Sequence, residues 1–380
     1  MIPYGKQNIN DEDIQAVVDV LKSPMLTQGE VIPIFEKEIS TYVDVQFAVA
    51  VNSATSALHI SCLALELGPG DLLWTVPNSF VASANVGILC GATVDFVDID
   101  MDTYIMSVSS LEEKLRNADL NGKLPKIVMP VHFGGQSADM KSIKQLSLQY
   151  GFSIIEDASH AIGADYLNHK VGSCQFSDIT VFSFHPVKII TTGEGGCATT
   201  KNQKLYERLK LFRSHGVTRS TDMMVTKSAE PWLYDQIEIG FNYRLTDFQA
   251  ALGLSQLRRI DFFVSERHRL AKIYHECLSD LEIILPKQFS KCRSAYHLFP
   301  IQVKNRKEVF NQLRAKKINV NVHYIPIHTQ PFWNTMGFQV GDFPNSEEYY
   351  SRAISIPLYP SLSEKDQAHV ISSLAASLID

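Results

Sequence analysis

The sequence predicts an α/β fold in which a mostly parallel central sheet is flanked by helices and followed by a smaller C-terminal α/β domain. Between about residues 45 and 250, short β-branched runs alternate with longer helical stretches, the pattern of a parallel sheet. A strongly amphipathic helical segment follows, from Thr246 to about Leu278. The 380 residues suit one large and one smaller domain. We expect these domains to span residues 1–255 and 256–380.

The first predicted element is a helix that Asn10 caps and that Pro24 ends, with Asp11 and Asp13 in its electropositive first turn. Strands are then predicted at Phe47–Val51, Leu72–Val76, Thr93–Asp98, Lys126–Val131, Phe152–Glu156 and Ile179–Phe184. Later strand-like runs occupy Cys197–Thr200, Ala295–Val303 and Val320–Val322, and a final helix is expected near residues 363–378.

Composition excludes several classes of protein. The 35 basic and 41 acidic residues give a formal net charge of −6, which argues against a general nucleic-acid binder. No apolar run approaches the ~18 to 20 residues that span a bilayer, and the N-terminal residues lack the apolar core of a signal peptide. Neither HExxH nor a Cys/His cluster at zinc spacing occurs. We therefore expect a cytoplasmic protein with no metal site and no membrane partner.

The candidate site residues follow predicted strands, because ligands of open α/β sheets bind at the carboxyl ends of strands. After the strand at 47–51, the N–H groups of a helix start and the Ser53 and Thr55 hydroxyls can hold a phosphate, although simple helix capping explains the same residues. Phe80 follows the next strand, and core packing and stacking on a flat ligand both fit its position.

Two adjacent acids, Glu156 and Asp157, end another buried strand, with His160 just beyond. A carboxylate at that position suits a cationic ring nitrogen, a ribose or a metal. Lys188 follows the strand at 179–184 and lies beside apolar Val187, Ile189 and Ile190. A lysine among apolar groups has a lowered pKa, which keeps a Schiff-base lysine nucleophilic, whereas most lysines simply extend into solvent.

The run from Gly193 to Ala198 matches the G-x-G-x-x-A pattern of dinucleotide-binding folds. That pattern has to open a helix and be followed by an acid about 20 residues later. Here a strand-like run follows at once, and no acid lies at the end of a second strand about 20 residues on. The context argues against a nicotinamide-dependent dehydrogenase.

Several segments occur in a fixed order between residues 51 and about 331: NSATSAL, PNSFVASAN, PVHFGGQSADM, IIEDASHAIG, FSFHPVKIITTGEGG, RSHG, IGFNYRLTDFQAAL and HYIPIHTQP. Together they resemble the sugar aminotransferases of the DegT/DnrJ/EryC1/StrS family, which are fold-type I enzymes dependent on pyridoxal 5′-phosphate. The opening IPYGKQNI and the later LTQG are similar to the branch that aminates a UDP-linked 4-keto sugar in pseudaminic acid biosynthesis.

The resemblance implies a role for each matching position. Lys188 would bind the cofactor covalently and act in catalysis, and Asp157 would pair with the pyridinium nitrogen. His160, where many relatives have Gln, would contact the ring oxygen, and Phe80 would stack on the ring. The cofactor phosphate is assigned to Ala54, Thr55, Ser183 and, from the second subunit of a homodimer, Asn242. Substrate contacts are assigned to Tyr4, Thr27, Gln28, Arg213 and His328.

The resemblance also implies the reaction: transfer of an amino group from L-glutamate to C4 of a nucleotide-linked 4-keto-6-deoxy sugar, with UDP-2-acetamido-2,6-dideoxy-β-L-arabino-hexos-4-ulose as the expected substrate. Some relatives are dehydratases with histidine in place of the lysine, so Lys188 favours transamination. Two alternatives stay open. One is a GDP-perosamine or dTDP-amino-sugar synthase of the same family, and the other is a non-catalytic protein that binds pyridoxal phosphate.

Overall fold

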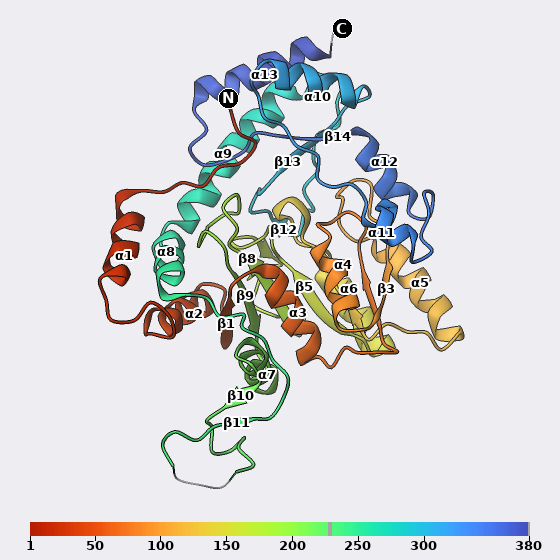
Figure 1. Cartoon of the computed structure of the whole chain (residues 1–380). Coiled ribbons are helices and arrows are strands. Elements are labelled where there is room, and N and C mark those ends of the chain that lie inside the picture. Colours follow the sequence, from red (N-terminus) through yellow and green to blue (C-terminus); the bar gives the residue numbers. More distant parts are fainter. Residues whose placement is uncertain (227–229, 379–380) are drawn as a thin grey trace.

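The computed structural model describes residues 1–226 and 230–378 of the chain. Within them, the central sheet has seven strands in the order β1-β9-β8-β5-β4-β2-β3 (Figure 1). Their bounds are β1 Phe47–Val51, β2 Leu72–Thr75, β3 Thr93–Phe96, β4 Ile127–Val128, β5 Ser153–Asp157, β8 Ile179–Ser183 and β9 Gly196–Thr200. In this sheet β9 pairs antiparallel with β1 and β8, and the other pairings are parallel. The predicted α/β class with a mostly parallel sheet is confirmed.

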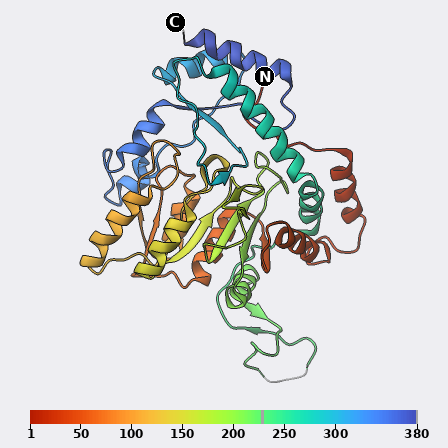
Figure 2. The same cartoon turned by 180° about the vertical axis from the view of Figure 1, so that it is seen from behind.

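Helices cover both faces of the sheet (Figures 1 and 2). Successive strand residues point to opposite faces, so Leu73 joins one apolar core and Trp74 another. The first core includes α3 (Ala54–Ala64), α4 (Ala82–Leu89) and α7 (Gln203–Arg213), and the second includes α5 (Val108–Leu120) and α6 (Met140–Tyr150). Burial on both faces explains why the strands read as continuous apolar runs.

The N-terminal helix is confirmed as α1 (Asp11–Leu21), with Asn10 and Asp13 forming a reciprocal capping box. The single long helix predicted from Thr246 is wrong. Two helices, α8 (Asp247–Leu257) and α9 (Ile260–Leu278), meet at Arg258 and Arg259. The Arg259 guanidinium donates to the Asn8 carbonyl and pairs with Asp13, so contacts with the N-terminal segment fix the break.

The C-terminal region is built on the antiparallel pair β13 (Phe299–Gln302) and β14 (Ala353–Ile356). It carries α10 (Arg306–Ala315), α11 (Pro331–Asn334), α12 (Pro344–Arg352) and α13 (Glu364–Ser377), the last confirming the predicted final helix. The strand expected at residues 320–322 is not formed, because Asn321 makes only an isolated bridge with Ser355. The division into residues 1–255 and 256–380 stays a prediction.

The remaining elements lie around this framework. Helix α2 (Val31–Tyr42) packs on β1 and α8. A small sheet is formed by β12 (Cys292–Arg293), β6 (Asp165–Tyr166) and β7 (His169–Lys170), and short 3-10 turns lie at Phe133–Gly135 and Ile327–Thr329.

The pair β10 (Val217–Thr218) and β11 (Asp235–Gln236) projects from the body (Figure 1, bottom). Of the helices described, none has the length and apolar character that a membrane span requires.

Gly135 joins the loop after β4 to the chain that leads into β13. Its carbonyl accepts from the Ala295 N–H at 2.9 Å, and its φ is +101°. A Cβ there would lie 2.8 Å from the Tyr296 nitrogen and 2.9 Å from the His297 nitrogen, so the backbones could not stay this close.

We predict that Gly135→Ala lowers the free energy of unfolding by about 2–4 kcal/mol, through overpacking and left-handed backbone strain. Gly151→Ala is the matched control, because Gly151 also has positive φ but a Cβ there meets nothing within 4 Å. Strain alone should reduce its stability by about 1 kcal/mol. Urea unfolding measures both variants, and equal losses would contradict the close-approach argument.

Candidate active site

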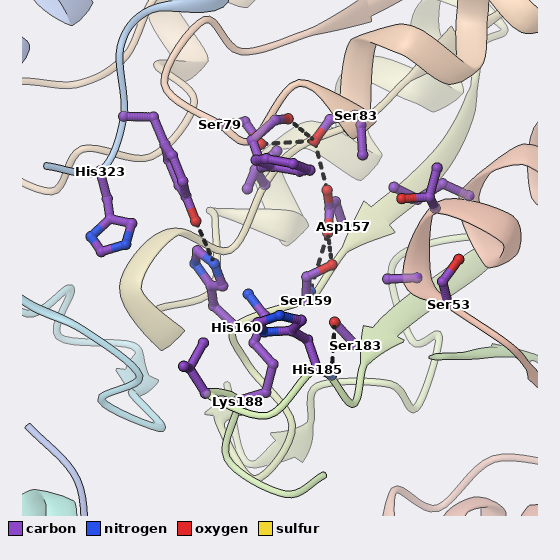
Figure 3. Close-up of a pocket in the computed structure, with 18 of the residues that line it drawn as sticks. Ser53, Ser79, Ser83, Asp157, Ser159, His160, Ser183, His185, Lys188 and His323 are labelled. Carbon is purple, nitrogen blue, oxygen red and sulfur yellow. Dashed lines mark hydrogen bonds between the residues drawn. The ribbon is translucent and has the colours of Figure 1, made fainter. Parts of the chain in front are cut away.

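A cavity of about 560 Å³ lies at the carboxyl ends of β5 and β8 (Figure 3). Its lining also comes from the start of α3, the loop between β2 and α4, and residues 321–324 of the C-terminal region. Segments far apart in the sequence therefore meet at the sheet edge where α/β folds bind ligands.

Asp157, the last residue of β5, presents a carboxylate that neighbouring groups hold in one orientation. One carboxylate oxygen accepts from the Ser83 hydroxyl at 2.7 Å. The other accepts from the Ser159 hydroxyl at 2.6 Å and from the Ser159 N–H at 3.1 Å (Figure 3). The residue is only 4% exposed, so these three donors replace the water that would otherwise solvate the charge. The arrangement presents an oriented, acceptor-only group to a cationic ligand atom.

Lys188 lies in the turn that follows β8, where its N–H donates to the His185 carbonyl. Burial of the amine lowers the pKa of Lys188 to about 8, while the Asp157 carboxylate acts in the opposite direction. More of this amine is neutral near pH 7 than that of an exposed lysine. A neutral amine in a cavity can attack a carbonyl carbon, which is the chemistry expected of a Schiff-base lysine.

The start of α3 forms an anion cradle on the same cavity. Ser53 caps the helix by accepting from the Ser56 N–H at 3.1 Å, and Ala54 and Thr55 line the cavity. The first N–H groups of a helix have no partner within the helix. Gly196 of β9 lies against this turn, and a Cβ there would be 2.5 Å from the Ala54 nitrogen. The helix dipole, free N–H groups and nearby Ser183 hydroxyl suit a phosphate.

His160 is buried at the cavity wall between two partners. The Gly134 N–H donates to His160 Nδ1 at 3.3 Å, and Nε2 lies 3.1 Å from the Tyr324 hydroxyl. Burial, with a smaller contribution from the Lys188 charge, lowers the pKa of His160 well below its usual range. Phe80 is 60% exposed although it lines the cavity, which leaves a ring face free for stacking.

The structure brings together most of the predicted site residues. The cavity lining includes Tyr4, Ala54, Thr55, Phe80, Asp157, His160, Ser183 and Lys188. These residues fit the phosphate, ring and aldehyde of pyridoxal phosphate, since the lysine amine, the carboxylate and the anion cradle all face one space. Outside the lining of this cavity lie Thr27, Gln28, Arg213, Asn242 and His328.

For two of these outlying residues the structure shows contacts of the side chain within the chain itself. Arg213 pairs with Glu36 at 2.6 Å and donates to the Ala50 carbonyl at 3.1 Å. His328 is fully buried and bonded to Glu347 at 2.9 Å. Neither residue lines the cavity of its own chain, and their assignment to the substrate stays a prediction.

Thr27 and Asn242 each form an isolated antiparallel β-bridge, Thr27 with Thr246 and Asn242 with Ser214. Gln28 has a positive φ of 57° in the same loop as Thr27. Any contact of these three residues with ligand would therefore have to be made elsewhere than in the cavity of their own chain. Their roles stay predictions.

The lining residues to which the sequence interpretation gave no role include Ser83, Ser159, Asn321 and Tyr324. Ser83, Ser159 and Tyr324 fall within segments that carried the family resemblance, so the signal was present without a role attached. Tyr324 is 164 positions from its partner His160, and no local pattern indicates such a contact.

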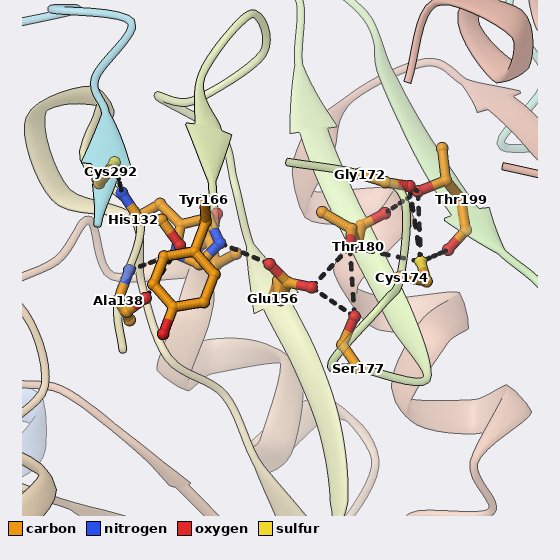
Figure 4. A network of polar contacts seen from close by, with 12 residues as sticks. His132, Ala138, Glu156, Tyr166, Gly172, Cys174, Ser177, Thr180, Thr199 and Cys292 are labelled. Carbon is orange, nitrogen blue, oxygen red and sulfur yellow. Dashed lines mark hydrogen bonds and ion pairs between the residues drawn. The ribbon is translucent and has the colours of Figure 1, made fainter. Parts of the chain in front are cut away.

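The two adjacent acids of β5 have different surroundings, because successive strand side chains point to opposite faces. Glu156 pairs with His132 Nε2 at 2.6 Å and accepts from the Thr180 and Ser177 hydroxyls (Figure 4). Burial raises the pKa of Glu156, but these hydrogen bonds together lower it below its usual value. The His132 N–H also donates to the Asp157 carbonyl at 3.0 Å. Glu156 thus braces the strand that presents Asp157.

Comparison with known proteins agrees with this geometry. Residues 7–375 match the DegT/DnrJ/EryC1/StrS aminotransferase family. A relative from Campylobacter jejuni subsp. jejuni serotype O:23/36 (strain 81-176), named UDP-4-amino-4,6-dideoxy-N-acetyl-beta-L-altrosamine transaminase, is 35% identical over 388 residues, covering 100% of this chain and 98% of the relative.

Solved structures show the same fold. Helicobacter pylori PseC, described as an aminotransferase involved in the biosynthesis of pseudoaminic acid, superposes with a TM-score of 0.91 at 31% identity, covering 100% of this chain and 99% of PseC. The PLP-form of the putative sugar aminotransferase Spr1654 from Streptococcus pneumoniae gives 0.89 at 27% identity, covering 100% and 98%. These findings confirm the predicted family, fold type, enzyme class and cofactor. The chain therefore belongs to the DegT/DnrJ/EryC1/StrS aminotransferase family of pyridoxal-phosphate-dependent sugar aminotransferases.

Proposed function

We propose that the chain transfers an amino group from L-glutamate to C4 of a nucleotide-linked 4-keto-6-deoxy sugar. The observation that carries this proposal is the meeting of the Lys188 amine, the Asp157 carboxylate and the start of α3 in one cavity. When bound, the cofactor supplies an electron sink for the negative charge that develops on the reacting carbon.

Lys188 has two roles in this proposal. Its amine would hold the cofactor covalently at rest, and once released the same nitrogen would accept and return a proton. An amine with a pKa near 8 serves both roles, because it is accessible in the neutral and the protonated form around neutral pH. Asp157 keeps the ring nitrogen protonated, and Ser83 and Ser159 hold the carboxylate in place.

The remaining assignments follow the shape of the cavity. We assign the cofactor phosphate to Ala54, Thr55 and Ser183, and ring stacking to Phe80. Tyr4 lines the same cavity from the N-terminal segment and is assigned to the substrate. Thr27 and Gln28 are kept as substrate residues on the strength of the resemblance.

The specific substrate that we propose is UDP-2-acetamido-2,6-dideoxy-β-L-arabino-hexos-4-ulose. Its support is the name of the Campylobacter relative and the pathway given for PseC. GDP- and dTDP-linked 4-keto sugars are the competing substrates, and a panel of all three nucleotide sugars separates them. A protein that binds the cofactor but transfers no amino group to any of them would be the non-catalytic alternative.

We further propose that the enzyme is a homodimer with shared active sites that works in the cytoplasm. The projecting β10–β11 segment supports a dimer, because it exposes large apolar side chains: Trp232 at 70%, Tyr234 at 54% and Ile239 at 76%. Exposed apolar groups gathered on one projection are typical of a protein contact. Asn242 follows this segment and is exposed in the single chain, so it is free to reach a partner's cofactor phosphate.

We predict that Lys188→Ala abolishes amino transfer, by at least about 10³-fold, because no other group in the cavity can both bind the cofactor covalently and move the proton. Turnover is measured as 2-oxoglutarate formed from L-glutamate in the presence of the keto sugar. Lys201→Ala removes an exposed lysine bonded to Gln175 and serves as the control. Wild-type turnover in Lys188→Ala would refute the proposed role of Lys188.

For Asn242→Ala we predict about tenfold weaker retention of pyridoxal phosphate, because one hydrogen bond to a charged phosphate is lost. Retention is measured by dialysis and absorbance, together with the molecular mass in solution. Asn121→Ala, at the end of α5, is the control because the Asn121 side-chain amide donates to the Asn117 carbonyl and does not line the cavity. A fully active monomer with unchanged retention would contradict the shared site.

A further inference from the structure

The hydrogen bonds around His160 fix where its proton lies. His160 Nδ1 accepts from the Gly134 N–H, so the proton of the neutral ring is on Nε2. Nε2 lies 3.1 Å from the Tyr324 hydroxyl oxygen and therefore donates to it. The Tyr324 hydroxyl thus acts as an acceptor toward His160 and keeps its own proton for another partner.

In the described part of the chain, no group accepts that proton. Among the residues that the structure describes, the Tyr324 hydroxyl has no hydrogen-bond partner other than His160. The side chain lines the cavity that also holds Lys188 and Asp157. A donor without an acceptor at a cavity wall favours a ligand that presents an oxygen there, because a donor left unsatisfied on ligand binding would reduce affinity.

Tyr324 is also held firmly enough to act as a fixed donor. Its N–H donates to the Asn78 side-chain oxygen at 3.2 Å. Its ring contacts those of Phe80 and Phe133, with centroids 6.4 Å and 6.3 Å away, and is nearly parallel to that of His160. These contacts fix both ends of the side chain, so little conformational freedom is left to lose when a ligand binds.

The surrounding groups keep the protonation of His160 and Tyr324, and so the direction of their hydrogen bond, constant at neutral pH. Burial and the Lys188 charge lower the pKa of His160, and burial raises the pKa of the Tyr324 hydroxyl, with further raising by Tyr4 and Asp157. His323 is the other titratable ring against Tyr324, and burial lowers its pKa to about 3, so it is neutral too. His160 therefore stays a neutral donor and Tyr324 stays protonated.

We infer that the Tyr324 hydroxyl donates a hydrogen bond to an oxygen of the ligand in this cavity, and that His160 is the positioning residue that aims it. This inference rests on the proposed function for the identity of the ligand. The family resemblance assigns His160 to the ring oxygen of the cofactor. In the structure its Nε2 proton is directed to Tyr324, so we assign the contact with the ligand to Tyr324 instead. The acceptor is an oxygen of the cofactor ring or an oxygen of the bound substrate, and the two sources are separable by experiment.

The test uses Tyr324→Phe in the full-length holoenzyme, with Tyr274→Phe as the matched control. Tyr274 is equally a tyrosine whose hydroxyl makes one hydrogen bond, to the Pro357 carbonyl at 2.8 Å, but it lies in the C-terminal core away from the cavity. Both variants remove one hydroxyl without changing the ring. Thermal unfolding confirms that each is folded.

The first measurement is the pH titration of the visible absorption band of the holoenzyme without substrates. If the acceptor is a cofactor oxygen, Tyr324→Phe moves the midpoint by about half a pH unit or more, and Tyr274→Phe leaves it in place. The second measurement is steady-state kinetics. If the acceptor is a substrate oxygen, the midpoint is unchanged and kcat/KM falls about tenfold or more for one of the two substrates.

A midpoint and kinetic constants that both match those of Tyr274→Phe would overturn the inference. Failure of the proposed function is visible separately, since wild-type holoenzyme would then transfer no amino group from L-glutamate to any keto sugar. The absorbance titration needs neither substrate and still decides whether Tyr324 contacts the cofactor.

Discussion

The site depends on one electrostatic balance, between the burial of the Lys188 amine and the charge of the Asp157 carboxylate. Burial favours the neutral amine and the carboxylate favours the charged one, and the result is a pKa of about 8. An amine in that range is nucleophilic without being permanently deprotonated. The Ser83 and Ser159 hydrogen bonds maintain the balance, because they fix the carboxylate that opposes the effect of burial on the amine.

The central sheet brings the groups of the site together. Parallel strands β5 and β8 end at one edge, so the acid and the lysine arrive together, and α3 begins beside them with its electropositive end toward the same space. On the opposite face of the sheet, the pairing of Glu156 with His132 stabilises the position of β5. The C-terminal region contributes the Tyr324 segment, and the contact at Gly135 ties that region to the loop after β4.

Features set by local sequence were predictable. The strands, the cap at Asn10 and the strand-end positions of Asp157 and Lys188 follow from periodicity and from the rule that ligands bind at strand ends. Features set by distant contacts were not. The break between α8 and α9 depends on Arg259 reaching Asn8 and Asp13, and Arg213 is committed to Glu36 across 177 positions. The pairing of Tyr324 with His160 likewise appears only in the folded chain.

The most direct test of this balance is the pH dependence of the rate at which the apoenzyme binds pyridoxal phosphate covalently, followed as the growth of the visible absorption band. Only the neutral amine attacks the aldehyde, so the rate should rise with pH and level off above a midpoint of about 8. In Asp157→Asn the midpoint should fall, because the group that favours the charged amine is removed. A rate that keeps rising toward the ordinary lysine value of 10.5 would contradict the account.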